Sequence, residues 1–390
     1  MAIHESLTLA FLLFFLPFRY SPATSLATAI PSPALLETLA LMKWKASLLP
    51  SKALHSWSLP AANATTNTIS PCKWIGISCN SIGSVTEISL PSAGLQGKLD
   101  NLSFSSFLNI RHLDFSDNTL TGTIPAHIRF LYKLTFLDLS ANEISGSIPL
   151  EMGNLVNLNE LDLSMNHLDG SIPSTLGNLT KLTILYLYDN HISSSIPPEL
   201  GNLKNLFELA LYPNNLTGLI PPALGNFSNL TIFYLYQTQV SGPIPSEIGN
   251  LVNLKELDVS SNLLTGSIPY TLGNLTKLTI LHLFENQISG SIPPEVGNLM
   301  SRYELGLYHN NLTGPIPPAL GNLTMLRILY LYHNQVSGSI PLEIGNLINL
   351  KQLVMSSNLL MDSIPSTLGN LTKLTILHLY DNQISGSIPV

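Results

Sequence analysis

The dipeptide Ile-Pro recurs along this chain at a constant spacing, and that spacing limits the fold more than any other feature. It begins at Ile124, returns 24 residues later at Ile148, and keeps the same step to Ile388. A fixed period of this length is typical of solenoids, in which each repeat is one supersecondary unit that stacks on the next. Although 390 residues would otherwise suggest two or three globular domains, the period predicts one repeat array.

The residues within each period predict what the unit looks like. One copy reads Leu182-x-x-Leu185-x-Leu187-x-x-Asn190 and continues through Ile196-Pro197 to Leu200-Gly201-Asn202-Leu203. This is the leucine-rich-repeat pattern, and its alternating leucines indicate a strand with one buried face. Because one strand cannot cover its own leucines, the coils must stack and pair their strands. We expect an α/β repeat solenoid, a leucine-rich-repeat superhelix with a parallel sheet on its concave face and short helical turns on its convex face.

Asparagine, proline and glycine at fixed positions have separate expected roles. The Asn after each strand should point inward and hydrogen-bond backbone groups, and Pro should start the helical turn. The Gly of Leu-Gly-Asn, such as Gly201, is expected to end that turn in a left-handed conformation. Thr238 replaces one Asn, so we expect weaker hydrogen bonding at that position of the Asn series. Arg302 replaces a core Leu, so we expect a local distortion there. Ser194 and Asp362 stand where the other repeats have Gly before Ser-Ile-Pro.

A longer period overlies the short one. The segment Ser171–Asn190 recurs almost unchanged from Ser267 and again from Ser363, which is 96 residues, or four repeats, each time. The array therefore grew by duplication of a four-repeat block. Repeated surface features can then be inherited copies, whether or not each copy is used.

The first residues have the features of a targeting segment. Leu7 to Phe18 is an apolar run that is too short to span a bilayer, and Ala27-Thr28-Ala29 offers a cleavage site. Residues 1–29 are predicted to be a signal peptide, with an uncleaved anchor as the alternative because no Lys or Arg precedes the run.

Residues 30–83 lack the period and are predicted to form a cap ahead of the array, which we place at 84–390. A capping unit is required because the end of a solenoid exposes a hydrophobic coil. Leu35 to Leu49 has helical apolar spacing and stops at Pro50. Secretion favours a disulfide between Cys72 and Cys79. The alternative, half of a metal site, lacks further ligands nearby.

Two motifs in this region carry a family resemblance. The segment Cys72-Lys73-Trp74-Ile75-Gly76-Ile77-Ser78-Cys79, with the L-x-G-x-I-P repeats, resembles the ectodomains of plant leucine-rich-repeat receptor-like kinases. Residues 41–48 (LMKWKASL) and 91–97 (PSAGLQG) are most similar to the male-discoverer-interacting receptor-like kinase group.

The resemblance implies a C-terminal cap, one transmembrane helix and a cytoplasmic Ser/Thr kinase after the array. The chain stops at Val390, midway through a repeat, so a fragment or a truncated gene prediction is expected in preference to a natural stop. Attachment to a membrane would depend entirely on that missing helix. The implied location is the outer face of the plasma membrane at full length, or otherwise the secreted fraction and the cell wall.

Outward positions of the strands predict the candidate binding surface. Aromatic rings at strand spacing on an exposed face are enriched at binding hot spots, although cross-strand stacking can also simply stabilise a sheet. Acidic residues beside them, including Glu208, Asp189, Glu285 and Asp381, could hold a cationic or hydroxyl-rich peptide or could be ordinary solvated charges. The candidate ligand-binding residues are Tyr186, Tyr188, Tyr212, Tyr234, Tyr236, Asp258, His282, Phe284, Tyr308, Tyr330 and Tyr332.

Glycosylation sequons favour the same surface by exclusion. A glycan is bulky and hydrophilic, so a column of glycans masks the face that carries it. Five sequons recur in the Gly-Asn segment away from the strands, at Asn178, Asn226, Asn274, Asn322 and Asn370. The other predicted acceptors are Asn63, Asn101, Asn215, Asn229 and Asn311. No sequon falls on an outward strand position, which leaves the concave face open.

No motif in the chain points to catalysis. It has no Gly-rich phosphate loop, no H-E-x-x-H and no nucleophile elbow, so we expect no enzyme activity and no cofactor. His309 and His333 could share a metal, but duplication explains the pair better, and no metal site is predicted. A net charge of -7 without clustered Lys and Arg argues against nucleic-acid binding.

The leading prediction is ligand recognition by a receptor ectodomain. The family resemblance supplies the preference for an extracellular peptide or protein ligand and for a co-receptor kinase of the same repeat class. One alternative is a secreted inhibitor of cell-wall-degrading enzymes, similar to polygalacturonase-inhibiting proteins. Another is a co-receptor or scaffold that has no small ligand.

Overall fold

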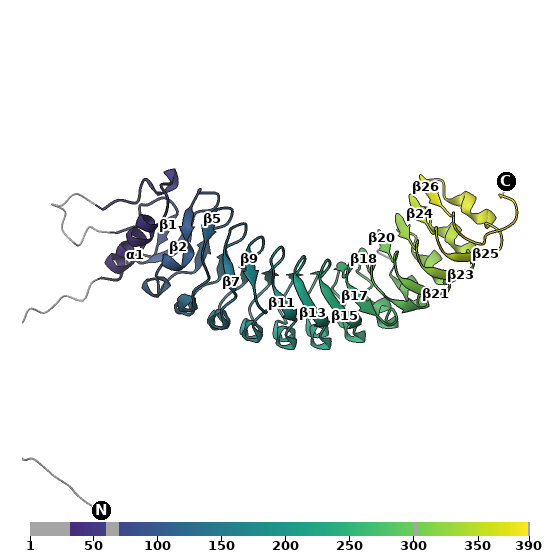
Figure 1. Ribbon diagram of the computed structural model, residues 1–390, viewed down its shortest axis with the longest axis horizontal. Helices are drawn as coiled ribbons and strands as arrows, with labels where there is room; N and C mark the ends of the chain where they lie inside the picture. Colours follow the sequence, from purple (N-terminus) through teal and green to yellow (C-terminus); the bar gives the residue numbers. More distant parts are fainter. Residues whose placement is uncertain (1–31, 60–69, 300–302, 389–390) are drawn as a thin grey trace, which may run out of the picture. The chain divides into compact units, whose positions relative to one another are not determined.

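The computed structural model describes residues 32–59, 70–299 and 303–388. The predicted signal peptide, the sequon at Asn63 and the distortion at Arg302 lie outside these residues, and they stay predictions. The chain divides into two units, Met1–Ser32 and Pro33–Val390, and the second unit contains the cap and the array. That unit is a solenoid with one strand of a long sheet in each coil (Figure 1).

A helix and a hairpin form the cap at the start of the array. Helix α1, Pro33–Ser47, matches the predicted helix, and it is followed by the short 3-10 helix η1, Lys52–Leu54. Strand β1, Ile77–Cys79, pairs antiparallel with β2, Val85–Ser89, which begins the array. The rings of Trp44, Trp57 and Trp74 pack in series with centroids 6.4 and 5.4 Å apart. Their burial covers the hydrophobic end that the first coil would otherwise expose.

One buried carboxylate joins the helix to the hairpin. Glu37 in α1 is almost fully buried, and it accepts hydrogen bonds from the Ser84 hydroxyl at 2.5 Å and from the Val85 N–H at 2.9 Å. Burial raises the pKa of Glu37, while these two hydrogen bonds act in the opposite direction. The contact fixes the helix against the strand that starts the solenoid.

The long sheet confirms the predicted strand in every repeat. It has 14 strands in the order β1-β2-β4 and then every second strand to β26, and all pairs after β1–β2 are parallel. Equivalent leucines lie side by side, as Leu185 does with Leu209, so the register equals the sequence period. The remaining strands are β4 His112–Asp114, β6 Phe136–Asp138, β8 Glu160–Asp162, β10 Ile184–Tyr186, β12 Glu208–Ala210, β14 Ile232–Tyr234, β16 Glu256–Asp258, β18 Ile280–His282, β20 Glu304–Gly306, β22 Ile328–Tyr330, β24 Gln352–Val354 and β26 Ile376–His378.

The opposite side of each coil is a 3-10 turn, and these turns stack along the convex face (Figure 1). From η5 onward a Pro with extended backbone immediately precedes each turn, as Pro173 precedes η7, which agrees with its predicted role. The turns are η3 Leu99–Asn101, η4 Phe104–Ser106, η5 Ala126–Phe130, η6 Leu150–Asn154, η7 Ser174–Asn178, η8 Pro198–Asn202, η9 Pro222–Asn226, η10 Ser246–Asn250, η11 Tyr270–Asn274, η12 Pro294–Asn298, η13 Pro318–Asn322, η14 Leu342–Asn346 and η15 Ser366–Asn370.

Between the long sheet and the turns, a second set of short parallel strands runs along one side of the coils. These strands, which were not predicted from the sequence, pair coil to coil in sheets of two or four strands. They are β3 Gln96–Lys98, β5 Thr119–Thr121, β7 Ser145–Ser147, β9 His167–Asp169, β11 Ser193–Ser195, β13 Asn215–Leu219, β15 Gln239–Pro243, β17 Leu263–Thr265, β19 Ser289–Gly290, β21 Asn311–Pro315, β23 Gln335–Ser339 and β25 Leu359–Met361.

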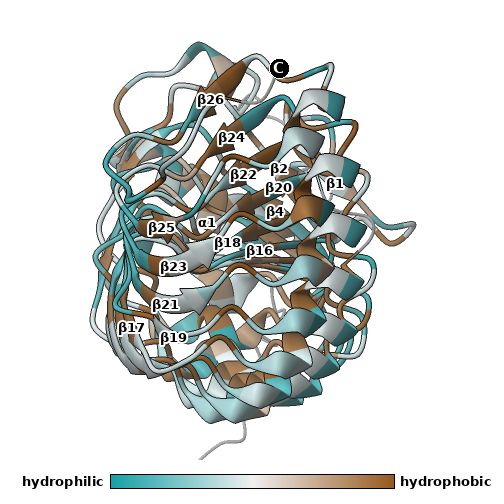
Figure 2. Ribbon diagram, turned by 90° about the vertical axis from the view of Figure 1, so that its right-hand side faces the viewer, coloured by the Kyte–Doolittle hydropathy of each residue, from teal (hydrophilic) through white to brown (hydrophobic). Residues whose placement is uncertain are grey.

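Leucine and isoleucine side chains fill the interior of the coils, and a ladder of asparagines runs beside them. Hydrophobic colouring follows the strands of the long sheet in Figure 2. Asn142 is buried; its Oδ1 accepts from Leu120 N at 2.9 Å and its Nδ2 donates to Phe115 O at 2.9 Å and to Leu139 O at 3.1 Å. The prediction of inward asparagines that satisfy backbone groups is therefore confirmed.

Thr238 makes fewer contacts than the asparagines, as predicted. Its hydroxyl donates to Leu235 O at 3.4 Å within its own coil and to Asn262 Oδ1 at 2.5 Å in the next coil. Among the described residues it makes no side-chain bond to the preceding coil, whereas each Asn bonds to that coil with both Oδ1 and Nδ2.

The expected role of the Leu-Gly-Asn glycine is wrong. Gly153, Gly177 and Gly201 have no positive φ, and each is buried against the next coil. A Cβ on Gly177 would lie 2.3 Å from the Glu199 carbonyl oxygen, so the absence of a side chain is what allows the turns to stack. The left-handed glycines are instead those before Ser-Ile-Pro, such as Gly146 at φ 74°.

Non-glycine residues also adopt left-handed backbone in this array. Ser194 and Asp362, which replace a left-handed glycine, have φ of 68° and 64°. In addition, the residue just before the ladder Asn is left-handed in nearly every coil, as in Asp189 at 53°. Such conformations cost about 1 kcal/mol or more for residues with a Cβ. The stacked coils impose them through the backbone bonds that link successive coils at this turn, such as Asp189 N to Tyr212 O at 3.1 Å.

Candidate functional site

The concave face consists of three columns of outward side chains, which we name by their members in one coil. The first column contains Ile184 and its equivalents, the second contains Tyr186 and its equivalents, and the third contains Tyr188 and its equivalents. Residues of the first two columns pair directly across neighbouring strands, as Tyr186 does with Ala210 and Ala210 with Tyr234. All eleven predicted ligand-binding residues lie in the second or third column.

Two runs of stacked rings occupy the third column. The first stack is Tyr188, Tyr212 and Tyr236, with successive centroids 5.3 and 3.9 Å apart. The second stack is Phe284, Tyr308 and Tyr332, with centroids 4.3 and 4.5 Å apart. The rings of each run are nearly parallel, and all six side chains are partly exposed. The rings contact one another across the strands and also present surface to solvent, and their role in ligand binding stays a prediction.

Tyrosines of the second column lean toward the next coil and donate to a carboxylate or amide of the first column. The Tyr186 hydroxyl donates to Glu208, the Tyr234 hydroxyl to Glu256, and the Tyr330 hydroxyl to Gln352. Burial raises the pKa of Tyr186 and Tyr234 well above the usual value, and the hydrogen bond and charge of the neighbouring Glu raise it further. These phenols stay protonated and hold the rings in place.

A pit opens in the first stack where the second column has a small residue. Ala210 lies between Tyr186 and Tyr234 on the neighbouring strands. Over it is a cavity of about 190 Å³. Its lining comprises Tyr186, Tyr188, Glu208, Ala210, Tyr212, Ile232 and Tyr234.

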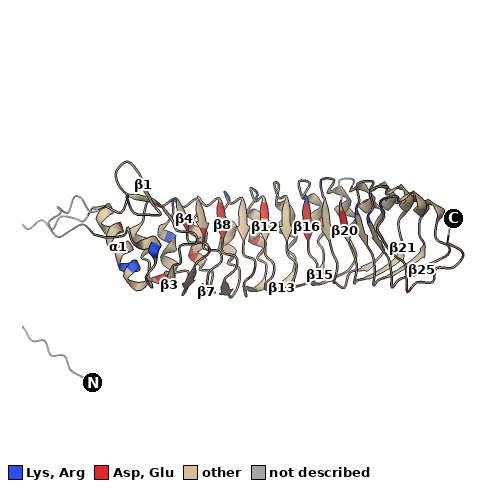
Figure 3. Cartoon of the chain, turned by 90° about the horizontal axis from the view of Figure 1, so that it is seen from above, with Lys and Arg blue, Asp and Glu red and all other residues tan. Residues whose placement is uncertain are grey.

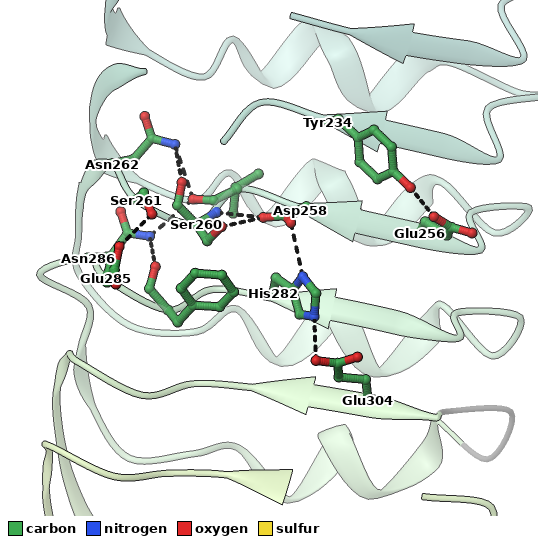
Figure 4. A network of polar contacts seen from close by, with 12 residues as sticks. Tyr234, Glu256, Asp258, Ser260, Ser261, Asn262, His282, Glu285, Asn286 and Glu304 are labelled. Carbon is green, nitrogen blue, oxygen red and sulfur yellow. Dashed lines mark hydrogen bonds and ion pairs between the residues drawn. The ribbon is translucent and has the colours of Figure 1, made fainter. Parts of the chain in front are cut away.

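Between the two stacks the aromatic column is interrupted by a polar cluster (Figure 4). Buried Ser260 donates to Asp258 Oδ1 at 2.6 Å, and the other Asp258 oxygen lies 2.9 Å from His282 Nδ1. His282 Nε2 lies 3.2 Å from Glu304 Oε1 as an ion pair without hydrogen-bond alignment, so Asp258 is the better-placed of the two partners. Burial disfavours a charged ring, but Asp258 and Glu304 outweigh it and raise the pKa of His282 to about 9.

Aspartates replace the tyrosines nearer the cap. Asp114, Asp138 and Asp162 follow one another in the second column, and each accepts from the Ser two residues later, as Ser164 donates to Asp162 at 2.6 Å. Burial raises the pKa of Asp162 to about 6; the Ser164 hydrogen bonds oppose that shift, and the charges of Asp138 and Glu160 add to it.

The described part of the concave face is acidic. Its three columns hold no Lys or Arg in any described coil, and the red strands β8, β12, β16 and β20 stand out in Figure 3. Four basic residues instead lie immediately before strands β4, β16, β22 and β24, namely Arg111, Lys255, Arg327 and Lys351. The carboxylates of the first two columns are Glu87, Asp114, Asp138, Glu160, Asp162, Glu208, Glu256, Asp258 and Glu304.

The remaining predicted sites lie away from this face. Cys72 and Cys79 form the predicted disulfide in the cap. The Asn side chains of the nine described sequons are exposed, and Asn178, Asn226, Asn274, Asn322 and Asn370 are the last residues of five 3-10 turns on the convex side. Their modification stays a prediction.

His309 and His333 stack with centroids 4.4 Å apart, but no cluster of three or more metal-ligating side chains occurs within the described residues. No helix in the described ranges is long and apolar enough to cross a membrane.

Comparison with known proteins defines the class. Residues 92–234 match the leucine-rich repeat region family, 35–80 match the leucine-rich repeat N-terminal domain, and five stretches between 253 and 371 match single leucine-rich repeats. A solved leucine-rich-repeat protein of Leptospira interrogans is 30% identical with a TM-score of 0.55, over 76% of each chain. The chain belongs to the leucine-rich-repeat proteins.

Within that class the chain is similar to plant receptor-kinase ectodomains. A probable leucine-rich repeat receptor-like protein kinase of Arabidopsis thaliana is 45% identical over 95 residues, which are 24% of this chain and 8% of the relative. The plant peptide hormone receptor RGFR1, solved in complex with RGF2, is 36% identical with a TM-score of 0.73, over 82% of this chain and 54% of that receptor chain. The chain thus spans only part of these relatives. The male-discoverer-interacting group is one of several receptor-kinase groups represented, and it is not singled out.

Two features of the site were missed in the sequence. These are the tyrosine–carboxylate pairs and the contacts of His282. The contacting residues are either 24 positions apart, which is one repeat, or 22 positions apart, which is two residues less than one repeat. A search for aromatic and acidic residues at those two separations would have found them.

Proposed function

We propose that this chain is an extracellular ligand-recognition module that binds a peptide along its concave sheet. The observation that carries the proposal is the pair of ring stacks in the third column, at Tyr188, Tyr212 and Tyr236 and again at Phe284, Tyr308 and Tyr332. Rigid aromatic side chains provide large contact area at small entropic cost, which suits a binding surface.

The arrangement of each stack favours an elongated ligand. The strands lie side by side about 4.8 Å apart. Each stack crosses three neighbouring coils, and the two stacks together extend from the coil of Tyr188 to the coil of Tyr332. An extended peptide can follow such a strip with its side chains reaching the second and third columns alternately. The exposed sequon asparagines on the convex turns are consistent with this placement, because glycans there leave the concave face uncovered.

The wider biological setting follows from the similarity to plant receptor kinases. We propose that the module belongs to a receptor-like kinase with a Ser/Thr kinase, of the male-discoverer-interacting group suggested by residues 41–48 and 91–97. It would act on the outer side of the plasma membrane and pair with a co-receptor kinase of the same repeat class.

A peptide selection tests the core of the proposal. The secreted ectodomain is used to select binders from a phage-displayed library of random dodecapeptides, and their affinities are measured by titration calorimetry. Replacing Tyr188, Tyr212 and Tyr236 with Ala is expected to weaken the selected peptides by about a hundredfold or more, since hot-spot truncations cost ~2 kcal/mol or more each.

The matched control replaces Tyr270, which is 67% exposed in η11 on the convex side. Its substitution by Ala should leave affinity within twofold. Peptides that bind the triple variant as tightly as the wild type would place the ligand elsewhere. If whole partner proteins bind the ectodomain and no peptide is selected, the co-receptor or scaffold alternative is favoured.

A further inference from the structure

We infer that the pit over Ala210 is an anchor pocket for one Lys or Arg side chain of an extended peptide. This inference rests on the proposed function and adds the ligand's chemistry to it. In this pit a cavity, the faces of aromatic rings and a negative charge lie together.

The shape fits one side chain. Ala210 provides a small floor between Tyr186 and Tyr234, which lie on the strands on either side. The cavity measures about 190 Å³, whereas pockets that enclose a whole small molecule are usually ~300–1,000 Å³. A single long side chain that enters from a peptide lying over the sheet is the matching occupant.

Charge selects a cation for this pit. Glu208 lines it, and the Tyr186 hydroxyl donates to Glu208 Oε2. The second oxygen, Oε1, accepts no hydrogen bond from the described residues, so it can accept from a ligand. Four tyrosines also line the pit, and their ring faces attract ammonium and guanidinium groups within about 6 Å. An Asp or Glu of the ligand would be repelled by Glu208 and would find no Lys or Arg in the columns around it.

The duplicated block provides an internal comparison. The residue four coils after Ala210 is Gly306, and the residue corresponding to Tyr186 is His282. A Cβ built on Gly306 would lie 3.1 Å from the Phe284 ring and 3.3 Å from the His282 ring, so these rings close over the second position. His282 also lies between the carboxylates of Asp258 and Glu304, and its protonated ring offsets one of their two negative charges. The first block therefore takes the basic side chain, and the second does not.

The experiment uses the phage-displayed random dodecapeptides on the intact ectodomain. The peptides recovered by the wild type are expected to share a Lys or Arg at one aligned position. Replacement of that residue by the uncharged citrulline, for an Arg, or norleucine, for a Lys, should weaken binding about tenfold, the usual effect of losing a charge-assisted hydrogen bond.

Two variants test the pit itself. Glu208→Gln removes the charge but keeps the acceptor for Tyr186, as Gln352 does for Tyr330 in the native chain, so folding should be preserved. In this variant the charged peptide should lose most of its advantage over the uncharged one, and the tyrosine rings account for the advantage that remains. Ala210→Leu fills the pit and should cost at least tenfold, while Val354→Leu in the same column of β24 is the control and should change nothing. Circular dichroism and thermal melts establish that each variant folds.

The possible results separate the inference from the function on which it rests. If peptides are recovered without a shared basic residue, the anchor pocket is wrong and peptide binding stands. The same conclusion follows if the preference for the charged peptide is undiminished in both Glu208→Gln and Ala210→Leu. If the wild type recovers no binding peptide, the proposed function fails, and the anchor pocket fails with it.

Discussion

The asparagine ladder allows Asn to be replaced by Thr at one position and Thr by Asn at an equivalent position of the same protein. Asn166 is a buried asparagine of the ladder, and Thr238 is a natural Thr in the equivalent position of another coil. We predict that Asn166→Thr destabilises the array and that Thr238→Asn stabilises it. Because the two positions are three coils apart, the two effects should add.

The magnitude follows from the hydrogen bonds at each position. Asn166 accepts from Ile144 N at 3.0 Å and donates to Leu139 O at 2.9 Å in the preceding coil, and it donates to Leu163 O and Ser164 O in its own coil. Thr238 makes one close bond at 2.5 Å and one long bond at 3.4 Å. The difference is about two bonds, each contributing ~1 kcal/mol, plus the penalty for leaving buried backbone groups unpaired. Asn166→Thr should therefore cost about 2–4 kcal/mol, and Thr238→Asn should add about 1–2 kcal/mol.

Guanidinium chloride unfolding, followed by circular dichroism, measures both changes. The slopes should match the wild type, so that a shift of the midpoint reports stability alone. The double variant should fall near the sum of the two. If Thr238→Asn lowers the midpoint, or if Asn166→Thr leaves it unchanged, the ladder does not stabilise the coils in the way described.

Three further predictions concern backbone packing and charge. Gly177→Ala places a Cβ 2.3 Å from Glu199 O and should cost about 1–3 kcal/mol in a denaturation experiment, whereas Gly369→Ala, with nothing within 4 Å, should change little; equal effects would refute the stacking argument. Ser194→Gly removes a left-handed residue with a Cβ at φ 68° and should increase the free energy of unfolding by about 0.5–1 kcal/mol, seen as a higher melting temperature. A lower melting temperature would show that the backbone is not strained there. His282 has a pKa of about 9 in the fold against 6.5 as the ordinary value, so its stabilisation is complete below pH 6.5 and is lost as the pH rises through 9. Allowing for partial exposure, the loss should be about 2 kcal/mol, and His282→Gln should remove that pH dependence of unfolding; a variant with the wild-type pH profile would show that another group titrates.

Much of the fold could be predicted because each coil repeats a local pattern. The constant step between Ile-Pro dipeptides fixed the strand register, and alternation around Leu185 and Leu187 identified which side chains face outward. The inward Asn was also predictable, because a bend leaves backbone groups that need partners. The columns of the concave face followed directly from the register.

The features that the sequence did not predict depend on distances between coils. Gly177 was expected to permit a left-handed turn, but it is required by the approach of the next coil, which a local pattern does not reveal. The Ala210 pit is lined by Tyr186, whose hydroxyl donates to Glu208 in the next coil. Likewise, the His282 charge depends on partners one coil before and one coil after. These features become predictable only after the stacking register is known.

The most direct test of the central claim is hydroxyl-radical footprinting of the wild-type ectodomain with and without a selected peptide. Mass spectrometry reports the oxidation of each tyrosine side chain. The peptide is expected to protect Tyr188, Tyr212 and Tyr236, while Tyr132 and Tyr270, which lie outside the three columns, oxidise at an unchanged rate. Protection of Tyr270 with no change in the first stack would contradict binding by the concave sheet.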